Sequence, residues 1–213
     1  MDFTQMLMKI AIGGCTWVLL ILIILSILSI ALIVEKFILY ARWVRETRRL
    51  WENLRRSLEG ERPQDMENLL EHCQTPIARV VSAGLEFLPS GTAAMMEAME
   101  GEKVIVRMEI ERRLAFLGTL GTNAPFIGLF GTVLGIIHSF KDLAVAGHGG
   151  GSVMAGISEA LVSTAVGLWV AIPAAIFFNV FKKKSNDMMV YADSISHLML
   201  SNFHKINNQR RPS

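Results

Sequence analysis

Residues 114–140 read LAFLGTLGTNAPFIGLFGTVLGIIHSF, a run of 27 residues without a charged side chain. A helix of about 20 residues crosses a hydrocarbon core about 30 Å thick, so this run is long enough to span a membrane. A backbone in lipid must satisfy its own hydrogen bonds, which an α-helix does. Two further uncharged runs have the same property, 10–34 with 25 residues and 160–181 with 22. The sequence therefore predicts an all-α membrane protein with three transmembrane helices.

The Lys and Arg residues predict how these helices are oriented. Of the 21 such residues, 13 lie in 35–113, 6 lie in 182–213, and the other two are Lys9 and Lys141. Basic residues close to the ends of spans mark the cytoplasmic side. We expect an outer N-terminus (1–9), a first span (10–34), a cytoplasmic helical region (35–113), a second span (114–140), an outer loop (141–157), a third span (158–181) and a cytoplasmic tail (182–213). The first run is longer than the apolar part of a signal peptide and no A-x-A site follows it, so we expect it to be retained.

Composition and motifs argue against several function classes. The net charge of +2 indicates no nucleic-acid partner. Cys15 and Cys73 fall in different environments, so we expect no disulfide between them, and neither has metal-ligand spacing. His72 beside Cys73 is read as part of an ordinary surface helix. No Ser/His/Asp set, H-E-x-x-H, P-loop or G-x-G-x-x-G occurs, so we expect neither an enzyme nor a cofactor.

Apolar spacing and turn signals predict helices outside the spans as well. A helical stripe covers 42–58. Pro63 and Pro76 can each start a further helix, to about Cys73 and about Leu88 respectively, and Pro89-Ser90-Gly91 ends the second of these. Thr92 is a candidate N-cap, and no Pro follows it before Pro125, so 92–140 is predicted as one unbroken helix. We also expect the third span to continue into the tail, which gives long cytoplasmic helical extensions.

The first two spans differ in composition. The first is apolar all round, which is typical of a helix that faces lipid. In the second span one face of the helical wheel carries small and hydroxyl residues: Gly128, Gly131, Thr132, Gly135 and Ser139. Pairs of small residues four apart allow close backbone contact between membrane helices. Such a face fits tight packing within one chain as well as it fits a functional role.

The third span begins near Glu159, and Ser163 and Thr164 follow within about a turn. Glu159 either complements the helix N-terminus at the interface or faces a shared aqueous path. Thr132 and Thr164 either bond their own i−4 carbonyls or line a polar seam that passes protons. A hydroxyl does not hold a proton at neutral pH, so a relay needs a carboxylate from another protein. Pro125 and Pro173 are expected to kink their helices.

Two segments carry a resemblance to a known family. They are 124–136 (APFIGLFGTVLGI), followed by His138-Ser139-Phe140, and 157–168 (ISEALVSTAVGL), followed by Ala171-Ile172-Pro173-Ala174 and Asn179. Both resemble signature segments of the ExbB/TolQ branch of the MotA/TolQ/ExbB proton-channel family. The resemblance covers 100–181, and the first span and 36–90 match in layout only.

The resemblance implies a homo-pentamer around a central pore in the cell inner membrane, with a periplasmic N-terminus. An ExbD- or TolR-like single-span partner inside the pore supplies an essential Asp, and a TonB- or TolA-like protein is engaged indirectly. Protons are then the coupling ion, and no cofactor is expected. The pore threonines of the family correspond to Thr132 and Thr164, and its third-span glutamate to Glu159, while Ser163 stands where relatives often have Ala.

The expected function is a subunit of a motor driven by the proton-motive force, which works on the cell envelope or on outer-membrane transport. Three spans rather than four separate the chain from the MotA type. We favour an ExbB-like over a TolQ-like protein. The alternatives are a non-conducting structural scaffold in the membrane and a gliding-motility stator of the same family.

Overall fold

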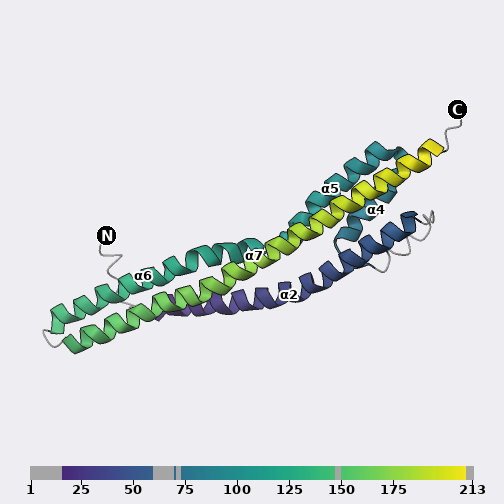
Figure 1. Cartoon of the computed structure of the whole chain (residues 1–213). Coiled ribbons are helices and arrows are strands. Elements are labelled where there is room, and N and C mark those ends of the chain that lie inside the picture. The colour runs from purple at the N-terminus through teal and green to yellow at the C-terminus, as the bar shows by residue number, and fades with distance from the viewer. Residues whose placement is uncertain (1–15, 60–69, 71–72, 147–149, 210–213) are drawn as a thin grey trace. The chain divides into compact units, whose positions relative to one another are not determined.

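The computed structural model describes residues 16–59, 70, 73–146 and 150–209, and these contain helices and no strand (Figure 1). In chain order the elements are α2 (Thr16–Glu59), α4 (Ile77–Phe87), the 3-10 helix η1 (Leu88–Ser90), α5 (Thr92–Glu111), α6 (Leu114–Ala146) and α7 (Gly150–Gln209). Three of them, α2, α6 and α7, are long and apolar enough to cross a membrane. The prediction of an all-α chain with three candidate membrane helices is therefore confirmed for the described residues.

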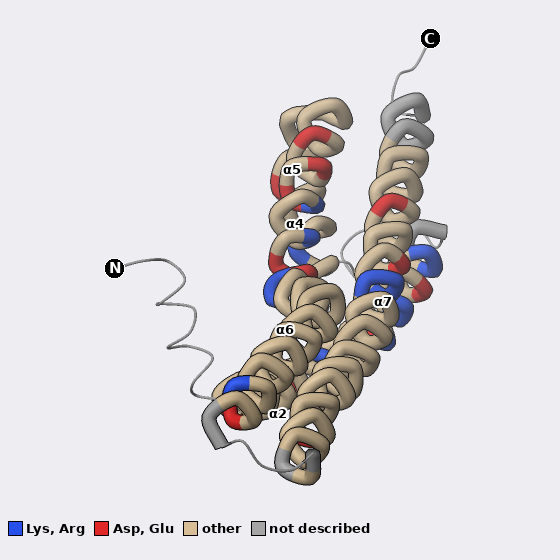
Figure 2. Tube along the Cα trace, turned by 90° about the vertical axis from the view of Figure 1, so that its left-hand side faces the viewer, with Lys and Arg blue, Asp and Glu red and all other residues tan. Residues whose placement is uncertain are grey.

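The helices form two compact units. Among the described residues, unit 1 takes those in 16–34 and 113–179, and unit 2 takes those in 35–112 and 180–209. Unit 1 thus contains the described parts of the uncharged runs, apart from the last two residues of the third. Charged residues are concentrated in the later part of α2, in α5 and in the later part of α7, and α6 is uncharged except near its end (Figure 2).

In unit 1, α6 packs antiparallel against α7, and glycines set the spacing. Residue numbers rise along α6 as they fall along α7, from Gly118 beside Phe178 to Gly128 beside Gly167. A Cβ built on Gly128 would lie 2.7 Å from the Ser163 carbonyl oxygen, and one on Gly167 would lie 2.7 Å from that of Ala124. Only glycine permits this backbone approach, which replaces the hydrophobic attraction that helices lack in lipid.

The predicted small-residue face of α6 is buried in this interface. All five of its members, Gly128, Gly131, Thr132, Gly135 and Ser139, have little or no exposed surface. The first helix joins the packing through Val18, whose side chain lies against Gly131, and through Trp17, whose ring meets Phe130 edge-on at 6.2 Å. The remaining side chains of α2 in unit 1 are largely exposed and apolar, as expected of a helix that faces lipid.

Unit 2 has a core of its own. One face of α4 (Ile77, Ala78, Val80, Val81 and Gly84) packs on α5, where the side chain of Met99 lies against Gly84. The two buried hydroxyls of Thr47 and Thr75 bond each other at 2.7 Å. The first and last helices meet through Trp51 and Tyr191, with ring centroids 6.2 Å apart. Buried hydroxyls that bond one another need no water, so these contacts are compatible with a dry core.

Two sequence predictions about helix ends are wrong. Gly91, not Thr92, is the N-cap of α5, because its φ of 107° suits glycine and Thr92 already has helical geometry. The predicted helix 92–140 is not continuous, since α5 ends at Glu111 and α6 begins at Leu114. Arg113 between them has a φ of 68°. The start of a helix after Pro76 and the turn at 89–91 are confirmed, whereas the helix predicted from Pro63 lies largely outside the described residues.

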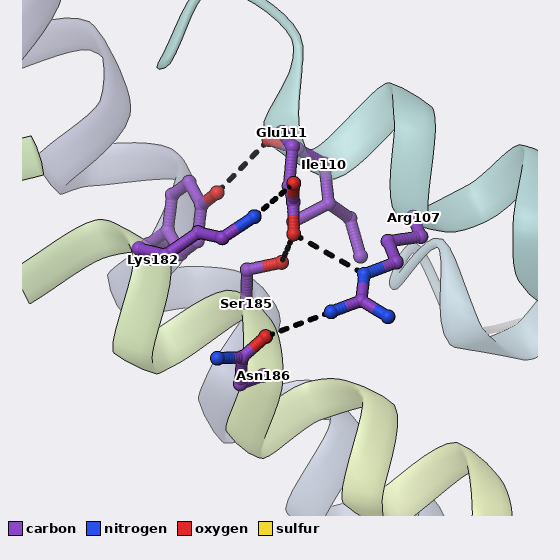
Figure 3. Close-up of polar contacts among 7 residues, drawn as sticks. Arg107, Ile110, Glu111, Lys182, Ser185 and Asn186 are labelled. Carbon is purple, nitrogen blue, oxygen red and sulfur yellow. Dashed lines mark hydrogen bonds and ion pairs between the residues drawn. The ribbon is translucent and has the colours of Figure 1, made fainter. Parts of the chain in front are cut away.

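The break at 112–113 is stabilised by side chains from distant parts of the chain. A helix end leaves carbonyl groups without helical donors, and the Tyr40 hydroxyl donates to one of them, the Ile110 oxygen, at 2.9 Å. The neighbouring Glu111 accepts hydrogen bonds from Lys182, from Ser185 at 3.0 Å and from Arg107 at 3.3 Å (Figure 3). Arg113, which follows these residues, has a backbone conformation that non-glycine residues rarely adopt.

The Glu111 carboxylate stays charged at neutral pH. Burial raises the pKa of this carboxyl group, but the hydrogen bonds from Lys182, Ser185 and Arg107 outweigh burial and hold the pKa below its usual value. Arg107 also donates to Asn186 at 3.0 Å, which ties the same turn of α5 to α7 a second time (Figure 3). The contact is thus a permanent ion pair and not a titrating switch.

A buried lysine in unit 2 leads to a prediction about stability. Lys103 on α5 is 8% exposed and pairs with Glu100 on its own helix and with Asp193 of α7 at 2.8 Å. Asp193→Ala should destabilise the protein by about 1–2 kcal/mol, because it leaves a buried ammonium with one acidic partner. Adding Lys103→Met to that variant should restore part of the loss, since the unpaired charge is then gone. Thermal unfolding followed by circular dichroism in detergent checks both; equal midpoints for the single and double variants would contradict the argument.

Candidate functional site

The two threonines singled out by the sequence meet between α6 and α7. Thr132 is buried, and its hydroxyl lies within hydrogen-bond distance of the Thr164 hydroxyl. It also reaches the carbonyl of Ala160 on α7 at 3.1 Å and that of Gly128 on its own helix at 3.3 Å. A hydroxyl has one proton to donate. Either Thr132 donates to one of the two carbonyl oxygens and accepts a hydrogen bond from the Thr164 hydroxyl, or Thr132 donates to Thr164. We call Thr132 and Thr164 the threonine pair.

The Thr132 hydroxyl has hydrogen-bond acceptors both within its own helix and on α7. Thr132 can bond its i−4 carbonyl, as a membrane threonine commonly does, and it can also bond across to α7. The cross-helix bonds depend on the close approach at Gly128, whose Cα lies against Gly167. A polar contact between helices is favourable where the surroundings are apolar, because no water competes for it. The glycines therefore make the threonine pair possible.

Ser163 does not join the threonine pair. Its side chain is fully buried and its oxygen has no hydrogen-bond partner among the described residues. It lies against Gly131, where an added Cβ would come within 3.0 Å of the Ser163 hydroxyl. Ser163 thus lies in the contact with Gly131 of α6, near Val18 of α2. Its hydroxyl packs in this contact and does not bond Thr132.

Glu159 lies apart from the threonine pair in this chain. It is exposed on α7, one residue before Ala160, whose carbonyl Thr132 reaches. Val162, three residues later and on the same side of α7, has an exposed apolar side chain. An ionisable group beside apolar surface is stable where it meets water or a polar group, and the exposed position of Glu159 is compatible with that requirement.

The prolines and one histidine complete the description of unit 1. Pro125 and Pro173 lie inside α6 and α7 and leave the carbonyls of Gly121 and Trp169 without their regular helical donors. His138 pairs with Asp142 one turn later at 3.5 Å, and its Nδ1 is buried with no partner among the described residues. The i, i+4 spacing of these two residues was the signal that could have indicated the pair.

Much of the outer surface of unit 1 is apolar on all three of its helices. The exposed large side chains on α6 and α7 include Phe126, Leu129, Phe130, Val133, Ile137, Leu168, Trp169, Ile172 and Ile176. A soluble protein rarely exposes contiguous apolar surface of this extent. Acyl chains, other copies or partner helices can cover it. Three apolar helices with this surface define a multi-pass membrane protein.

Comparison with known proteins gives the family. Residues 72–194, more than half of the chain, match the MotA/TolQ/ExbB proton channel family, and the chain belongs to it. The chain is 38% identical over 118 residues to the Tol-Pal system protein TolQ of Pseudomonas aeruginosa, which covers 50% of this chain and 51% of that protein. It is 41% identical over 100 residues to the biopolymer transport protein ExbB of Salmonella typhimurium, 41% of each.

A further relative is the biopolymer transport protein ExbB-like 2 of Helicobacter pylori strain 26695, 37% identical over 102 residues, which are 47% of this chain and 68% of that protein. The chain spans about half the length of TolQ, the first of these relatives. TolQ and ExbB proteins match with similar identities, 38% and 41%, so the preference for an ExbB-like protein stays a prediction.

Proposed function

We propose that this protein is the pore-forming subunit of a proton-driven motor in the cell inner membrane. The observation that carries the proposal is the threonine pair, two hydroxyls in contact across α6 and α7 within a largely apolar bundle. Hydroxyls that donate and accept can pass a proton but do not store one. Membership of a proton channel family supports this reading of the pair.

The working assembly in this proposal contains more than one chain. The threonine pair lacks a group that titrates, and Glu159 is exposed, so the proton carrier comes from a partner: a single-span protein of the ExbD or TolR kind with an Asp in its span. Copies of the chain, five in the expected arrangement, surround that partner and cover the apolar face of α6 and α7. The N-terminus is periplasmic, 35–113 and 182–213 are cytoplasmic, and the work reaches the envelope through a TonB- or TolA-like protein.

A structural scaffold is the second candidate, and one observation favours it. Gly128, Gly131 and Gly167 are fully explained by close helix packing, and Thr132 also bonds its own helix, so no feature of the interface requires an ion path. The proposed motor and the scaffold differ in one measurable property, which is proton movement across a sealed membrane.

The test is proton flux in proteoliposomes. The chain is purified with a candidate single-span partner that has an Asp in its span, reconstituted, and placed under a membrane potential with a pH-sensitive dye inside. We expect flux with the partner present and none when the Asp of the partner's span is replaced by Asn. Empty liposomes provide the background. An assembled complex that carries no flux above this background, under any potential, would contradict the motor and support the scaffold.

A further inference from the structure

Six residues of unit 2 form a connected cluster around the break between α5 and α6. Tyr40 donates to the Ile110 carbonyl and stacks on Phe181 with ring centroids 5.3 Å apart. Glu111 binds Lys182 and Ser185. We call these six residues, Tyr40, Ile110, Glu111, Phe181, Lys182 and Ser185, the collar.

The collar is placed where the chain passes between the two units. The chain leaves one unit and enters the other after Val34, after Arg112 and after Asn179. Every collar residue lies within six positions of one of these points, and each of the three passages contributes at least one collar residue. The collar therefore connects, inside unit 2, the three chain segments that link the two units. A displacement that travels along the chain from one unit to the other has to pass through these segments.

The passage at 112–113 has the weakest local structure. The helices α2 and α7 run through their passages as continuous α-helix, but α5 and α6 are separated by two residues, one with a φ of 68°. A stretch without regular helical hydrogen bonds bends more readily than a helix. Among the contacts that hold α5 next to this break, the collar supplies the two at its last residues: the hydrogen bond to the Ile110 carbonyl and the ion pair at Glu111.

Most of the collar is buried, as expected of contacts that hold a fixed geometry. Tyr40 and Phe181 have no exposed surface and Ser185 has none either, while the Glu111 side chain is 23% exposed. The Lys182 side chain is 41% exposed, so this ion pair is only partly shielded. The additional hydrogen bonds to Glu111 from Ser185 and Arg107 fix its geometry more than an isolated exposed pair would be fixed. The Tyr40 hydroxyl, as a buried donor, would be left unsatisfied if α5 moved away.

We propose that the collar is a mechanical joint that positions the end of α5 on α7 and passes displacements of unit 1 to unit 2. In its absence the break at 112–113 bends and absorbs them. The joint rests on the proposed function, because it transmits what proton flow produces. Glu111 and Tyr40 are positioning residues in this scheme and take no part in proton transfer.

The experiment compares work with flux in the full complex. Glu111→Gln and Tyr40→Phe each remove one hydrogen-bonding function while keeping the shape of the side chain. Glu52→Gln is the matched control, because it removes an exposed ion pair with Arg48 in the same unit. For each variant we measure the amount of assembled complex, proton flux in proteoliposomes, and proton-dependent envelope work in a strain that lacks the gene.

We expect both collar variants to assemble and to keep flux close to that of the unaltered protein, while work per unit of flux falls by about threefold or more. Glu52→Gln should leave the ratio unchanged. The double variant Glu111→Lys with Lys182→Glu exchanges the two charges. It should recover part of the work per unit of flux that Glu111→Gln loses. If work per unit of flux is unchanged in both collar variants, the proposed joint is wrong. It is also wrong if flux and work fall only in proportion to the amount of assembled complex. If the unaltered complex carries no flux, the proposed function fails and the joint fails with it.

Discussion

Replacing Thr132 and Thr164 together by valine should abolish proton-driven work and leave the complex assembled. Valine keeps the shape of threonine and removes the hydroxyl, so the contact between α6 and α7 becomes apolar at the point where the two oxygens now meet. The carbonyls of Gly128 and Ala160, which Thr132 reaches, each lie four residues before one of these threonines and keep their regular helical donors. No buried acceptor is therefore left unsatisfied, and the cost to folding should be small.

The size of the expected effect follows from the chemistry. A proton cannot pass through a stretch where neither donor nor acceptor remains, so flux should fall at least about tenfold, which is about 1.4 kcal/mol or more in the barrier. Each single variant should retain part of the flux, because one hydroxyl remains to bond water. The measurement is the proteoliposome assay with the partner, accompanied by the amount of complex recovered on purification.

A control variant tests whether the loss of any hydroxyl on α6 would reduce proton flux as much as the loss of the threonine pair. Thr122 on α6 is exposed and donates within its own helix, toward Gly118 and Thr119. Thr122→Val should reduce flux far less than the double variant. Normal flux in the double variant would show that the threonine pair lies off the path, and the scaffold would then be the better account.

The sequence predicted the parts of the fold that depend on composition and periodicity. Uncharged runs long enough to cross a membrane coincide with α2, α6 and α7, because the run length alone determines whether a helix can span the core. Helical spacing also predicted that Gly128, Gly131 and Thr132 share one face of α6, whereas its burial against α7 was one of two alternatives that the sequence left open.

The break between α5 and α6 was not predicted, for a physical reason. Arg112 and Arg113 carry no turn signal, and neither is Gly or Pro. The contacts beside the break are made with Tyr40, 70 residues from Ile110, and with Lys182, 71 residues from Glu111. Such contacts are set by the folded chain and cannot be found from local propensity.

The sequence singled out Thr132 and Thr164 but could not predict that they are in contact. Thr132 and Thr164 lie 32 residues apart on separate helices, and helical wheels cannot show whether two such faces meet. The structure brings these two together and places Ser163 and Glu159 elsewhere. Neighbours in sequence differ by about 100° around a helix, so Ser163 and Thr164 were bound to point in different directions.

Gly128→Leu should prevent assembly of the folded protein, and Gly167→Leu should do the same. A Cβ on Gly128 would lie 2.7 Å from the Ser163 carbonyl oxygen and 3.1 Å from the Thr164 Cα, and both are backbone atoms that cannot turn aside. On Gly167 the corresponding neighbours are the Ala124 carbonyl oxygen and the Gly128 Cα. The helices must separate to admit the side chain, which also breaks the threonine pair.

The clashes predict an order among the glycines. Gly131 meets side-chain atoms only, those of Ser163 and Val18, so Gly131→Leu should be damaging but less so than Gly128→Leu. Gly101 on α5 has nothing near its Cβ position, and Gly101→Ala should stabilise the protein by about 0.5–1 kcal/mol through helix propensity. Yield of monodisperse complex and its thermal midpoint rank the four variants. If Gly128→Leu assembles as well as Gly101→Ala does, the helices are not in the contact that brings Thr132 to Thr164, and the basis of the proposed proton path is lost.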